Sequence, residues 1–285
     1  MSTTCLQFDK PSYQFKLFNT ESVIRRAFTL FGEDCAVSWS GGKDSTLVLH
    51  LALKIWREMG FKTKLKVIFE NTLVEFPETI YFIRKLTTLW NIDLIETRPI
   101  DGWTFRKILL LKGPPKCRQT NKQGKQRTPL CCIYLKEKPA MNALKKHGIK
   151  CLLTGVTTAE SETRGYLKRY DHCGAEKDGL HFTQFYYYST TWNCWKFNPI
   201  MNWTEKEVFD IHKRLSIPLN EVYTKWNRCY NRCGCLPCTA YKGWRRKLSR
   251  SHPKIYCWML TFFRKKYTEP DIAVSYGTDT IRGKE

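Results

Sequence analysis

One short stretch, residues 38–45 (Ser-Trp-Ser-Gly-Gly-Lys-Asp-Ser), constrains the fold of this chain more than any other. The apolar run of residues 35–37 precedes it, and residues 46–53 carry apolar side chains at helical spacing. A strand, a glycine turn and a helix in succession form an anion site, because the first amides of the helix are unpaired and lie at the positive end of its dipole. The string differs from a Walker-type loop, which has a longer glycine spacing. The ligand contacts expected here are Ser38, Ser40, Gly41, Gly42, Lys43, Asp44 and Ser45.

Strand and helix signals alternate after this loop. Apolar runs of strand type are followed by helical patterns, one of which starts at Pro77. Alternation of this kind predicts an α/β fold with a doubly wound, mostly parallel sheet and helices on both faces. Ligands bind such sheets beyond the C-terminal strand ends, where Thr72 and the segment after Thr154 also fall. The expected strands are residues 65–69, 94–97 and 151–154, and the expected helices include residues 20–30, with Thr20 as N-cap, and residues 133–146.

Composition limits the partners and the compartment. The 48 Lys and Arg against 26 Asp and Glu give a formal net charge of +22, which favours a polyanion partner, with nucleic acid as the leading candidate. Thirteen cysteines argue for metal or redox chemistry before disulfides. No apolar run is long enough to span a membrane, and the N-terminus lacks a signal-peptide pattern, so we expect a cytoplasmic protein without a membrane partner.

Two segments carry much of the positive charge. Residues 112–129 form a basic loop, either a substrate or nucleic-acid contact or a solvated insertion. Residues 241–267 are expected to form a basic helix or helix pair with interleaved aromatics, on which bases can stack while cations meet phosphates. The alternative is an amphipathic helix whose aromatics pack on the domain. The aromatics concerned are Trp244, Tyr256, Trp258, Phe262 and Phe263.

Four motifs in order carry a family resemblance. The string Ser-Gly-Gly-Lys-Asp-Ser after a strand resembles the PP-loop of the ATP-pyrophosphatase superfamily, whose members cleave ATP between the α and β phosphates or handle adenylates. Three further motifs resemble loops of the phosphoadenylyl-sulfate reductase family within it. They are Glu-Phe-Pro-Glu-Thr in residues 69–79, the Gly, acid-Ser and Arg pattern of residues 154–164, and Pro-Ile-x-x-Trp-Thr in residues 198–208.

The resemblance covers most of the chain and implies an adenine-nucleotide α-hydrolase-like fold. We expect an N-terminal lead-in over residues 1–33, an adenylate-binding domain over residues 34–239 and a basic helical extension over residues 240–285. In the last motif, Thr204 is expected to cap a helix, with Glu207 completing a capping box. One departure is that this chain has Asn71-Thr72-Leu73 where the family commonly has Asp-Thr-Gly.

The resemblance also assigns roles at the nucleotide site. It implies that Arg164 points at the phosphate or sulfate of the adenylate, which the guanidinium fork matches bidentately. Lys43 and Arg164 would stabilise developing phosphate charge, and Asp44 would contact Mg²⁺. Thr72 and Gly155 would border the bound ATP or adenylyl sulfate.

The cysteines resemble those of the iron–sulfur branch of the family. There, Cys-Cys together with Cys-x-x-Cys holds a [4Fe-4S] cluster, and a lysine follows the first pair as Lys136 does here. A four-cysteine zinc site that uses Cys229 and Cys233 is one alternative, and Cys233 as an iron ligand in place of one of the first pair is another. A purely buried first pair is the third. The ligand set implied by the resemblance is Cys131, Cys132, Cys235 and Cys238.

Three functions follow, in order of preference. The first is an adenylating sulfurtransferase that binds ATP, adenylates an oxygen of tRNA or DNA and replaces it with sulfur from a donor protein. The second is a reductase of adenylyl sulfate or its 3′-phosphorylated form, which would need a reductant. Reductases of this family attack with a cysteine in a C-terminal Glu-Cys-Gly-x-His string, whereas the last cysteine here, Cys257, lies in a predicted helix. The third is a nucleic-acid-binding module with a vestigial nucleotide site.

Overall fold

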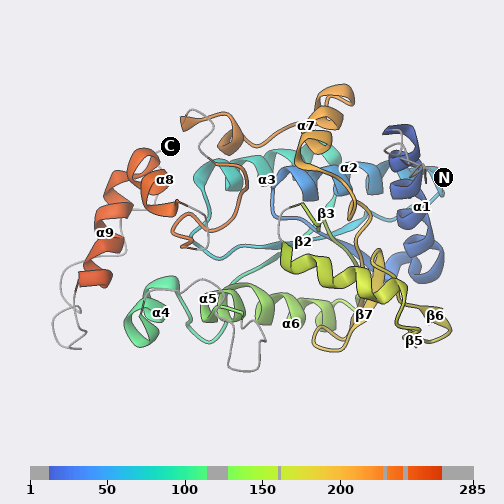
Figure 1. Ribbon diagram of the computed structural model, residues 1–285, viewed down its shortest axis with the longest axis horizontal. Helices are drawn as coiled ribbons and strands as arrows, with labels where there is room; N and C mark the ends of the chain where they lie inside the picture. The colour runs from blue at the N-terminus through green and yellow to red at the C-terminus, as the bar shows by residue number, and fades with distance from the viewer. Residues whose placement is uncertain (1–12, 114–127, 160–161, 227–229, 240–242, 265–285) are drawn as a thin grey trace, which may run out of the picture.

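A mixed six-stranded sheet forms the centre of the molecule (Figure 1). The computed structural model describes residues 13–113, 128–159, 162–226, 230–239 and 243–264 of the 285. The strand order is β3-β2-β1-β4-β8-β7, with β7 antiparallel to β8 and the other neighbours parallel. The predicted doubly wound, mostly parallel sheet is therefore confirmed. Its strands are β1 (Cys35–Ser38), β2 (Lys66–Glu70), β3 (Asp93–Thr97), β4 (Cys151–Leu153), β7 (Tyr186–Ser189) and β8 (Cys194–Phe197).

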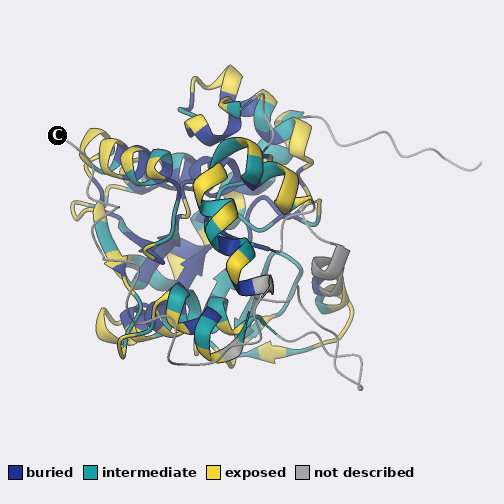
Figure 2. Ribbon diagram, turned by 90° about the vertical axis from the view of Figure 1, so that its left-hand side faces the viewer, coloured by how far each residue is buried: buried dark blue, intermediate teal, exposed yellow. Residues whose placement is uncertain are grey.

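Helices cover both faces of this sheet because its central strands are apolar on both sides. In β1, Val37 packs into the core beneath one layer of helices, whereas Ala36 packs with Leu144 on the opposite face. Figure 2 shows the buried strands enclosed by helices whose outer faces are exposed. The first layer is α1 (Tyr13–Phe31), α2 (Lys43–Glu58), α3 (Pro77–Trp90) and α7 (Glu205–Arg214), and α6 (Lys138–Lys146) covers the other face.

A second apolar core lies beside the sheet, at the end where α4, α8 and α9 are seen in Figure 1. It joins Phe105 and Leu109 of α4 (Phe105–Lys112) to Leu248 of α8 (Trp244–Ser251) and Met259 of α9 (Pro253–Arg264). The remaining elements are α5 (Leu130–Cys132), the π-helix η2 (Ile133–Glu137), the 3-10 helices η1 (Gly32–Asp34), η3 (Glu162–Asp171) and η4 (Glu221–Tyr223), and the hairpin β5 (Glu176–Lys177) with β6 (Leu180–His181).

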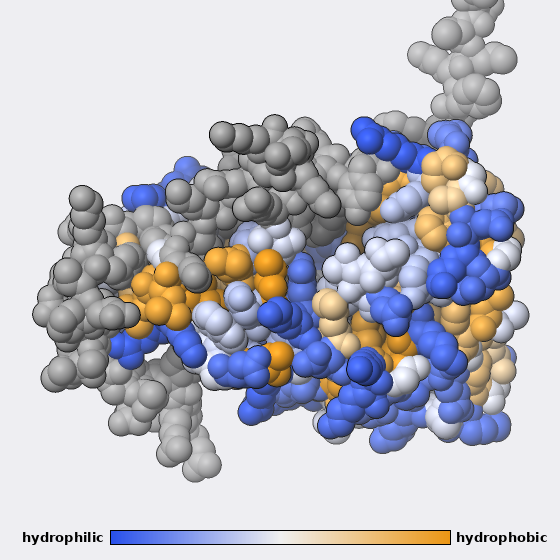
Figure 3. Space-filling view, turned by 90° about the horizontal axis from the view of Figure 1, so that it is seen from below, coloured by the Kyte–Doolittle hydropathy of each residue, from blue (hydrophilic) through white to orange (hydrophobic). Residues whose placement is uncertain are grey.

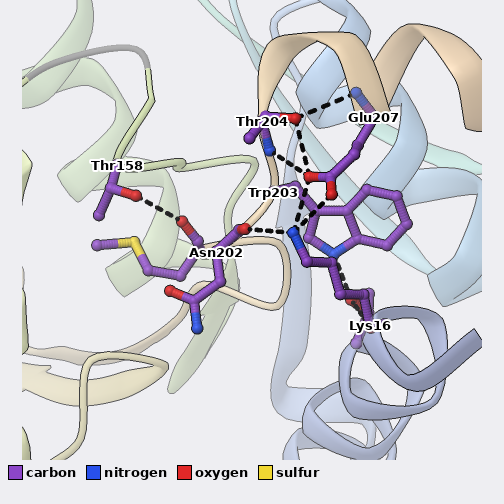
Figure 4. Close-up of polar contacts among 8 residues, drawn as sticks. Lys16, Thr158, Asn202, Trp203, Thr204 and Glu207 are labelled. Carbon is purple, nitrogen blue, oxygen red and sulfur yellow. Dashed lines mark hydrogen bonds and ion pairs between the residues drawn. The ribbon is translucent and has the colours of Figure 1, made fainter. Parts of the chain in front are cut away.

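The capping box predicted at the fourth motif is present (Figure 4). The Thr204 hydroxyl accepts a hydrogen bond from the Glu207 amide, and the Glu207 carboxylate accepts one from the Thr204 amide. Lys16 of α1 also contacts this carboxylate, with 2.7 Å between Nζ and Oε1. Helix α1 is therefore tied to the start of α7, and its Ile24 and Phe28 lie in the core of the sheet.

Some predicted boundaries were wrong. Thr20 lies in the middle of α1 and does not cap the helix. Its hydroxyl donates to the carbonyls of Lys16 and Pro199. The helix expected over residues 133–146 begins at Leu130 and contains a π-helical turn. Strands β7 and β8 were missed because their polar and aromatic residues lack a clean alternation. In the part of the chain that the structure describes, no helix is long and apolar enough to cross a membrane.

Candidate functional site

The loop after β1 is organised by its glycines and by two serines. Gly41 has a φ of 70°, and a Cβ there would lie 3.0 Å from the Thr79 methyl group, so the turn favours glycine. The hydroxyls of Ser40 and Ser45 are 3.1 Å apart, and Ser45 donates to the carbonyl of Gly42 at 3.1 Å. Helix α2 starts at Lys43, directly after Gly42. The sequence-predicted loop therefore has the strand–turn–helix geometry of an anion site, and the first residues of α2 are buried.

The loop lysine and aspartate form a buried pair. Lys43 Nζ lies 2.7 Å from Asp44 Oδ2, and their side chains are only 1% and 9% exposed. Glu205 at the start of α7 lies 3.8 Å from the same ammonium, and the rings of Phe209 and Tyr223 lie beside it. The roles of Lys43 on phosphate and of Asp44 on Mg²⁺ stay predictions, and the pair leaves further donors on the ammonium and a second oxygen on the carboxylate for them.

Three residues behind the loop fix its backbone. The Lys43 amide donates to the Tyr223 hydroxyl at 3.0 Å, and Asn220 donates to the Gly41 carbonyl at 3.2 Å. His212 Nε2 lies 2.7 Å from the Lys43 carbonyl, to which it donates. Burial lowers the pKa of His212 below its usual 6.5, so its neutral form is favoured. No local pattern marks these residues, because each lies on or after α7, far along the chain from the loop.

Gly155 explains why the third motif needs glycine. A Cβ at this position would lie 2.5 Å from the Ser45 amide nitrogen, closer than any side chain could tolerate. The segment after β4 therefore touches the start of α2, as expected for a strand end that borders the nucleotide. The backbone of Arg164 lies in η3, but its side chain is outside the described part of the structure, so its phosphate contact stays a prediction.

Thr72 lies at the end of β2 and connects the nucleotide side to the cysteines. Its hydroxyl donates to Glu75 Oε1 at 2.7 Å and lies 3.4 Å from the Cys235 sulfur. The Glu75 side chain is 2% exposed, and Lys136 Nζ lies 3.7 Å from it. An isolated antiparallel bridge pairs Glu75 with Cys235, so the cysteine-bearing segment is held against the β2 loop by its backbone.

The predicted cysteine ligands come from two segments that face each other. The charges of Cys235 and Cys238 act on the Cys131 thiol, whose pKa is lowered chiefly by a hydrogen bond with Cys132. Burial raises the pKa of Cys235 to about 12, and the Lys136 ammonium opposes this shift. Within the described ranges, no three His, Cys, Asp or Glu side chains stand close enough together to hold a metal ion. The four thiols fit a cluster in residue type, but the described structure does not gather three of them at one point.

Cys233 lies on the nucleotide side. Its thiol donates to the Gly41 carbonyl at 3.7 Å, and burial raises its pKa to about 12. Cys235, two residues later, contacts Thr72 and Glu75 instead. The sequence alone left open whether Cys233 ligates iron, and the set of Cys131, Cys132, Cys235 and Cys238 stays a prediction. Cys229 lies outside the described residues, so the zinc alternative that includes it stays open.

Charged side chains surround the cysteine segments from the sheet side. Burial raises the pKa of Glu70 at the end of β2. Burial works against the charge of Lys136, yet the negative groups beside it, Glu75 and Glu70 among them, raise its pKa well above the usual value. On β8, burial lowers the pKa of Lys196, whose ammonium lies 3.7 Å from the centre of the Trp192 ring. Of these two lysines, Lys136 is therefore the one whose charge is held beside the predicted ligand thiols.

Comparison with known proteins agrees with this geometry. The model of the family described as "Phosphoadenosine phosphosulfate reductase domain" matches residues 34–241. The adenosine 5′-phosphosulfate reductase of Salinibacter ruber is 26% identical over 227 residues, which are 79% of this chain and 75% of the relative. That of Bacillus mycoides is 25% identical over 223 residues, covering 78% and 80%. Candida glabrata FMN adenylyltransferase shares the fold, with a TM-score of 0.51 and 17% identity over 76% of this chain and 65% of that one. The chain therefore belongs to the phosphoadenosine phosphosulfate reductase domain family of PP-loop enzymes.

Proposed function

We propose that this enzyme is an adenylating sulfurtransferase that acts on nucleic acid. The observation that carries the proposal is the contact between the PP-loop and the cysteine-bearing segment, in which Cys233 reaches the Gly41 carbonyl and Cys235 reaches Thr72. An oxygen activated at the loop and sulfur held at the thiols would share one cleft. The net charge of +22 supports a polyanionic acceptor over a small adenylate.

The reaction has two balanced steps. An oxygen of the acceptor attacks the α-phosphorus of ATP, so that an O–P bond forms, the bond to the β-phosphate breaks and pyrophosphate leaves. A sulfide equivalent then attacks the acceptor carbon, the C–O bond breaks and AMP leaves with the oxygen. Sulfur enters at the oxidation state of sulfide, so no further reductant is consumed. Adenylation converts a poor oxygen leaving group into AMP.

The chain's own residues would serve the first step. Amides at the start of α2, with the hydroxyls of Ser40 and Ser45, would receive the phosphates, and Lys43 and Arg164 would stabilise their developing charge. Asp44 would hold Mg²⁺. Cys131, Cys132, Cys235 and Cys238 would hold a [4Fe-4S] cluster, which when bound would carry or position sulfide. Lys136 would lie beside it.

Calorimetry on anaerobically purified protein tests the proposal. We expect ATP·Mg²⁺ to bind more tightly than either adenylyl sulfate or its 3′-phosphorylated form. Adding tRNA or DNA should then release pyrophosphate, with the more effective polymer identifying the acceptor. Tight binding of an adenylyl sulfate with ATP ignored would refute the sulfurtransferase.

Reduction of adenylyl sulfate is the second candidate function. It is favoured by one observation, that curated relatives at 24–26% identity over about three-quarters of this chain are named adenosine 5′-phosphosulfate reductase. A reductase would release sulfite and AMP from adenylyl sulfate at the expense of a thiol reductant. Sulfite formation in the presence of thioredoxin or glutathione, without any nucleic acid, would establish it. Retained nucleic-acid binding without any nucleotide turnover would instead support a vestigial site. A cytoplasmic location remains a prediction.

A further inference from the structure

Two long segments of this chain contain no acidic residue. Between Asp101 and Glu137 there are nine Lys and Arg, and between Glu221 and Glu269 there are twelve. The rest of the chain carries all 26 Asp and Glu and is close to balanced. Positive charge on this protein is therefore concentrated in two segments that lie about a hundred residues apart in the sequence.

The fold brings these two segments together. Phe105, Ile108 and Leu135 of the first pack in one core with Tyr230, Leu248 and Met259 of the second, at the end of the molecule that holds α4, α8 and α9 (Figure 1). We call the described parts of residues 102–136 and 222–264 the acid-free lobe. Seen from below, hydrophilic side chains dominate the described surface, and hydrophobic groups form several small patches, one of them toward the end at which Figure 1 places α4 (Figure 3). The predicted cluster ligands Cys131, Cys132, Cys235 and Cys238 all belong to this lobe.

The aromatics of α8 and α9 are used inside the lobe. Phe262 is buried, and Trp244, Tyr256 and Trp258 pack against the second core. Arg246, Arg250 and Lys254 are exposed. The helix pair therefore offers cations to a partner, whereas its described aromatics stabilise the fold. Base stacking, if it occurs, must take place elsewhere on the lobe.

A stacked aromatic pair beside the cysteines supplies such a place. The rings of Trp103 and Tyr134 lie 4.1 Å apart with 23° between their planes, and both side chains remain partly exposed. Lys107 lies over the Trp103 ring at 5.0 Å and Lys138 over the Tyr134 ring at 4.5 Å, each four residues after its aromatic. Both lysines are exposed, so each can move from its ring to a phosphate.

The position of Tyr134 relates this pair to the thiols. It lies two residues after Cys132, in the π-helical turn η2. Such turns are rare and occur frequently at functional sites, since they displace side chains from the regular helical register. A base stacked on this pair would lie next to the segment that carries the first two cysteines.

We propose that the acid-free lobe is the docking surface for a single-stranded stretch of nucleic acid, with one base stacking at Trp103 and Tyr134. The backbone phosphates would follow the cations of α4, α8 and α9, and the stacked base would be presented toward the cysteines. The acceptor rests on the proposed function, but the surface itself requires only binding. Single-stranded nucleic acid fits because bases in a duplex do not expose their faces.

Fluorescence anisotropy with labelled 20-mers tests the surface, using single-stranded RNA, single-stranded DNA and a duplex. Arg246→Ala/Arg250→Ala removes two exposed cations one turn apart on α8. Lys62→Ala/Lys64→Ala removes two exposed cations from the loop before β2, outside the lobe. We expect the first variant to bind single strands about tenfold or more weakly and to lower the slope of log affinity against log salt by roughly 1.4, because each lost phosphate contact contributes about 0.7. The second variant should match the wild type within about twofold.

The base-stacking step has its own pair of variants. Tyr134→Leu should weaken single-strand binding about 5- to 100-fold, the range expected for one stacked base, whereas Tyr134→Phe should bind as the wild type does. A 2-aminopurine placed along the strand should be quenched at one position by the wild type and by Tyr134→Phe. Equal loss in both variants would contradict stacking, as would a preference for duplex.

The two proposals can fail separately. A wild-type protein that binds none of the three oligonucleotides at low salt would overturn both the surface and the nucleic-acid acceptor. Wild-type binding that weakens equally in the α8 variant and in Lys62→Ala/Lys64→Ala would overturn the surface and leave the acceptor standing. Pyrophosphate release lost in the α8 variant with ATP binding unchanged would support both.

Discussion

The core of the sheet and the second core differ in the charge that surrounds them. Around the sheet, lysines and acids pair across elements, as in Lys16 with Glu207, Lys54 with Glu21 and Lys150 with Asp34. The acid-free lobe itself contains no Asp or Glu, and the acids that its cations meet, such as Glu75 at Lys136 and Glu78 at Lys225, belong to other segments. Charges that are balanced within the fold add little to binding, whereas an unbalanced surface attracts a polyanion. The comparison therefore separates a half that would bind nucleotide from a half that would receive sulfur and the acceptor.

The largest expected effect is that a substitution of a predicted cluster ligand removes the cofactor and leaves nucleotide binding intact. Cys132→Ser should abolish the brown colour, the iron and the acid-labile sulfide of anaerobically purified protein, because a cluster needs all four thiolates. ATP affinity should stay within about threefold, because no hydrogen bond joins this thiol to the described residues of the PP-loop. Ultraviolet–visible spectra, iron analysis and calorimetry provide the measurements.

Two cysteines outside the predicted ligand set serve as controls. Cys257→Ser, at an exposed position on α9, should change neither readout. Cys233→Ser should keep the colour but weaken ATP binding, because its thiol lies on the Gly41 carbonyl. If Cys233→Ser is colourless and Cys132→Ser is brown, the ligand set is wrong.

A substitution at Gly155 is expected to do the opposite, weakening ATP binding while the cofactor is retained. A Cβ would lie 2.5 Å from the Ser45 amide nitrogen, so Gly155→Ala must displace the start of α2. We expect about tenfold or weaker ATP binding and a loss of about 1–3 kcal/mol in the free energy of unfolding, with the colour retained. Gly60→Ala is the matched control, since Gly60 has a φ of 80° but open space around it. It should cost about 1 kcal/mol and leave ATP binding unchanged, and a loss of ATP binding there would break the assignment.

A smaller effect is expected on the free energy of unfolding at acid pH, through His212 on the sheet side. The folded-state pKa of His212 is lowered by burial, so the unfolded state binds more protons below its usual 6.5. The contribution to stability is therefore complete above pH 6.5 and is lost as the pH falls below that value. His212→Gln keeps an N–H donor for the Lys43 carbonyl but does not titrate. The free energy of unfolding in urea, measured at pH 7 and pH 5, should fall less in this variant than in the wild type. An equal fall in the two proteins would exclude His212 as the cause.

The smallest effect is expected at Leu73, between the two halves. Leu73 has a φ of 63°, a left-handed conformation that costs a side chain about 1 kcal/mol, at the place where the related family commonly has glycine. Leu73→Gly should raise the free energy of unfolding by about 0.5–1 kcal/mol, because the exposed side chain packs little. Thermal unfolding would measure this increase. A lower stability of Leu73→Gly would mean that the packing of the leucine side chain outweighs the backbone strain.

The sequence predicted the sheet half well because its signals are local. The glycine turn before α2, Pro77 at the start of α3 and the capping box at Thr204 each specify structure within a few residues. The strands β1, β2 and β4 are largely buried and apolar, so they were visible as continuous runs. Strands β7 and β8 were missed because edge and aromatic-rich strands carry a weaker pattern.

Long-range contacts could not be predicted in the same way. Asn220 and Tyr223 hold the PP-loop from about 180 residues away in sequence, and no local pattern marks them. The aromatics of residues 241–267 could be assigned from the sequence either to bases or to the core, and the second core decides in favour of packing for the described ones, Trp244, Tyr256, Trp258 and Phe262. The same core also brings the two acid-free segments together.

One peptide of this protein can report on both halves at once. Cys233 and Cys235 are separated by a single residue, yet one thiol lies on the PP-loop and the other on the Thr72–Glu75 side. Trypsin cleavage after Arg232 and Lys242 would release both, with Cys238, in one ten-residue fragment. If the protein is alkylated before digestion, the mass spectrum of this one peptide would give the extent of alkylation at each cysteine. Protection of Cys233 would report bound nucleotide, and protection of Cys235 and Cys238 would report a bound cofactor.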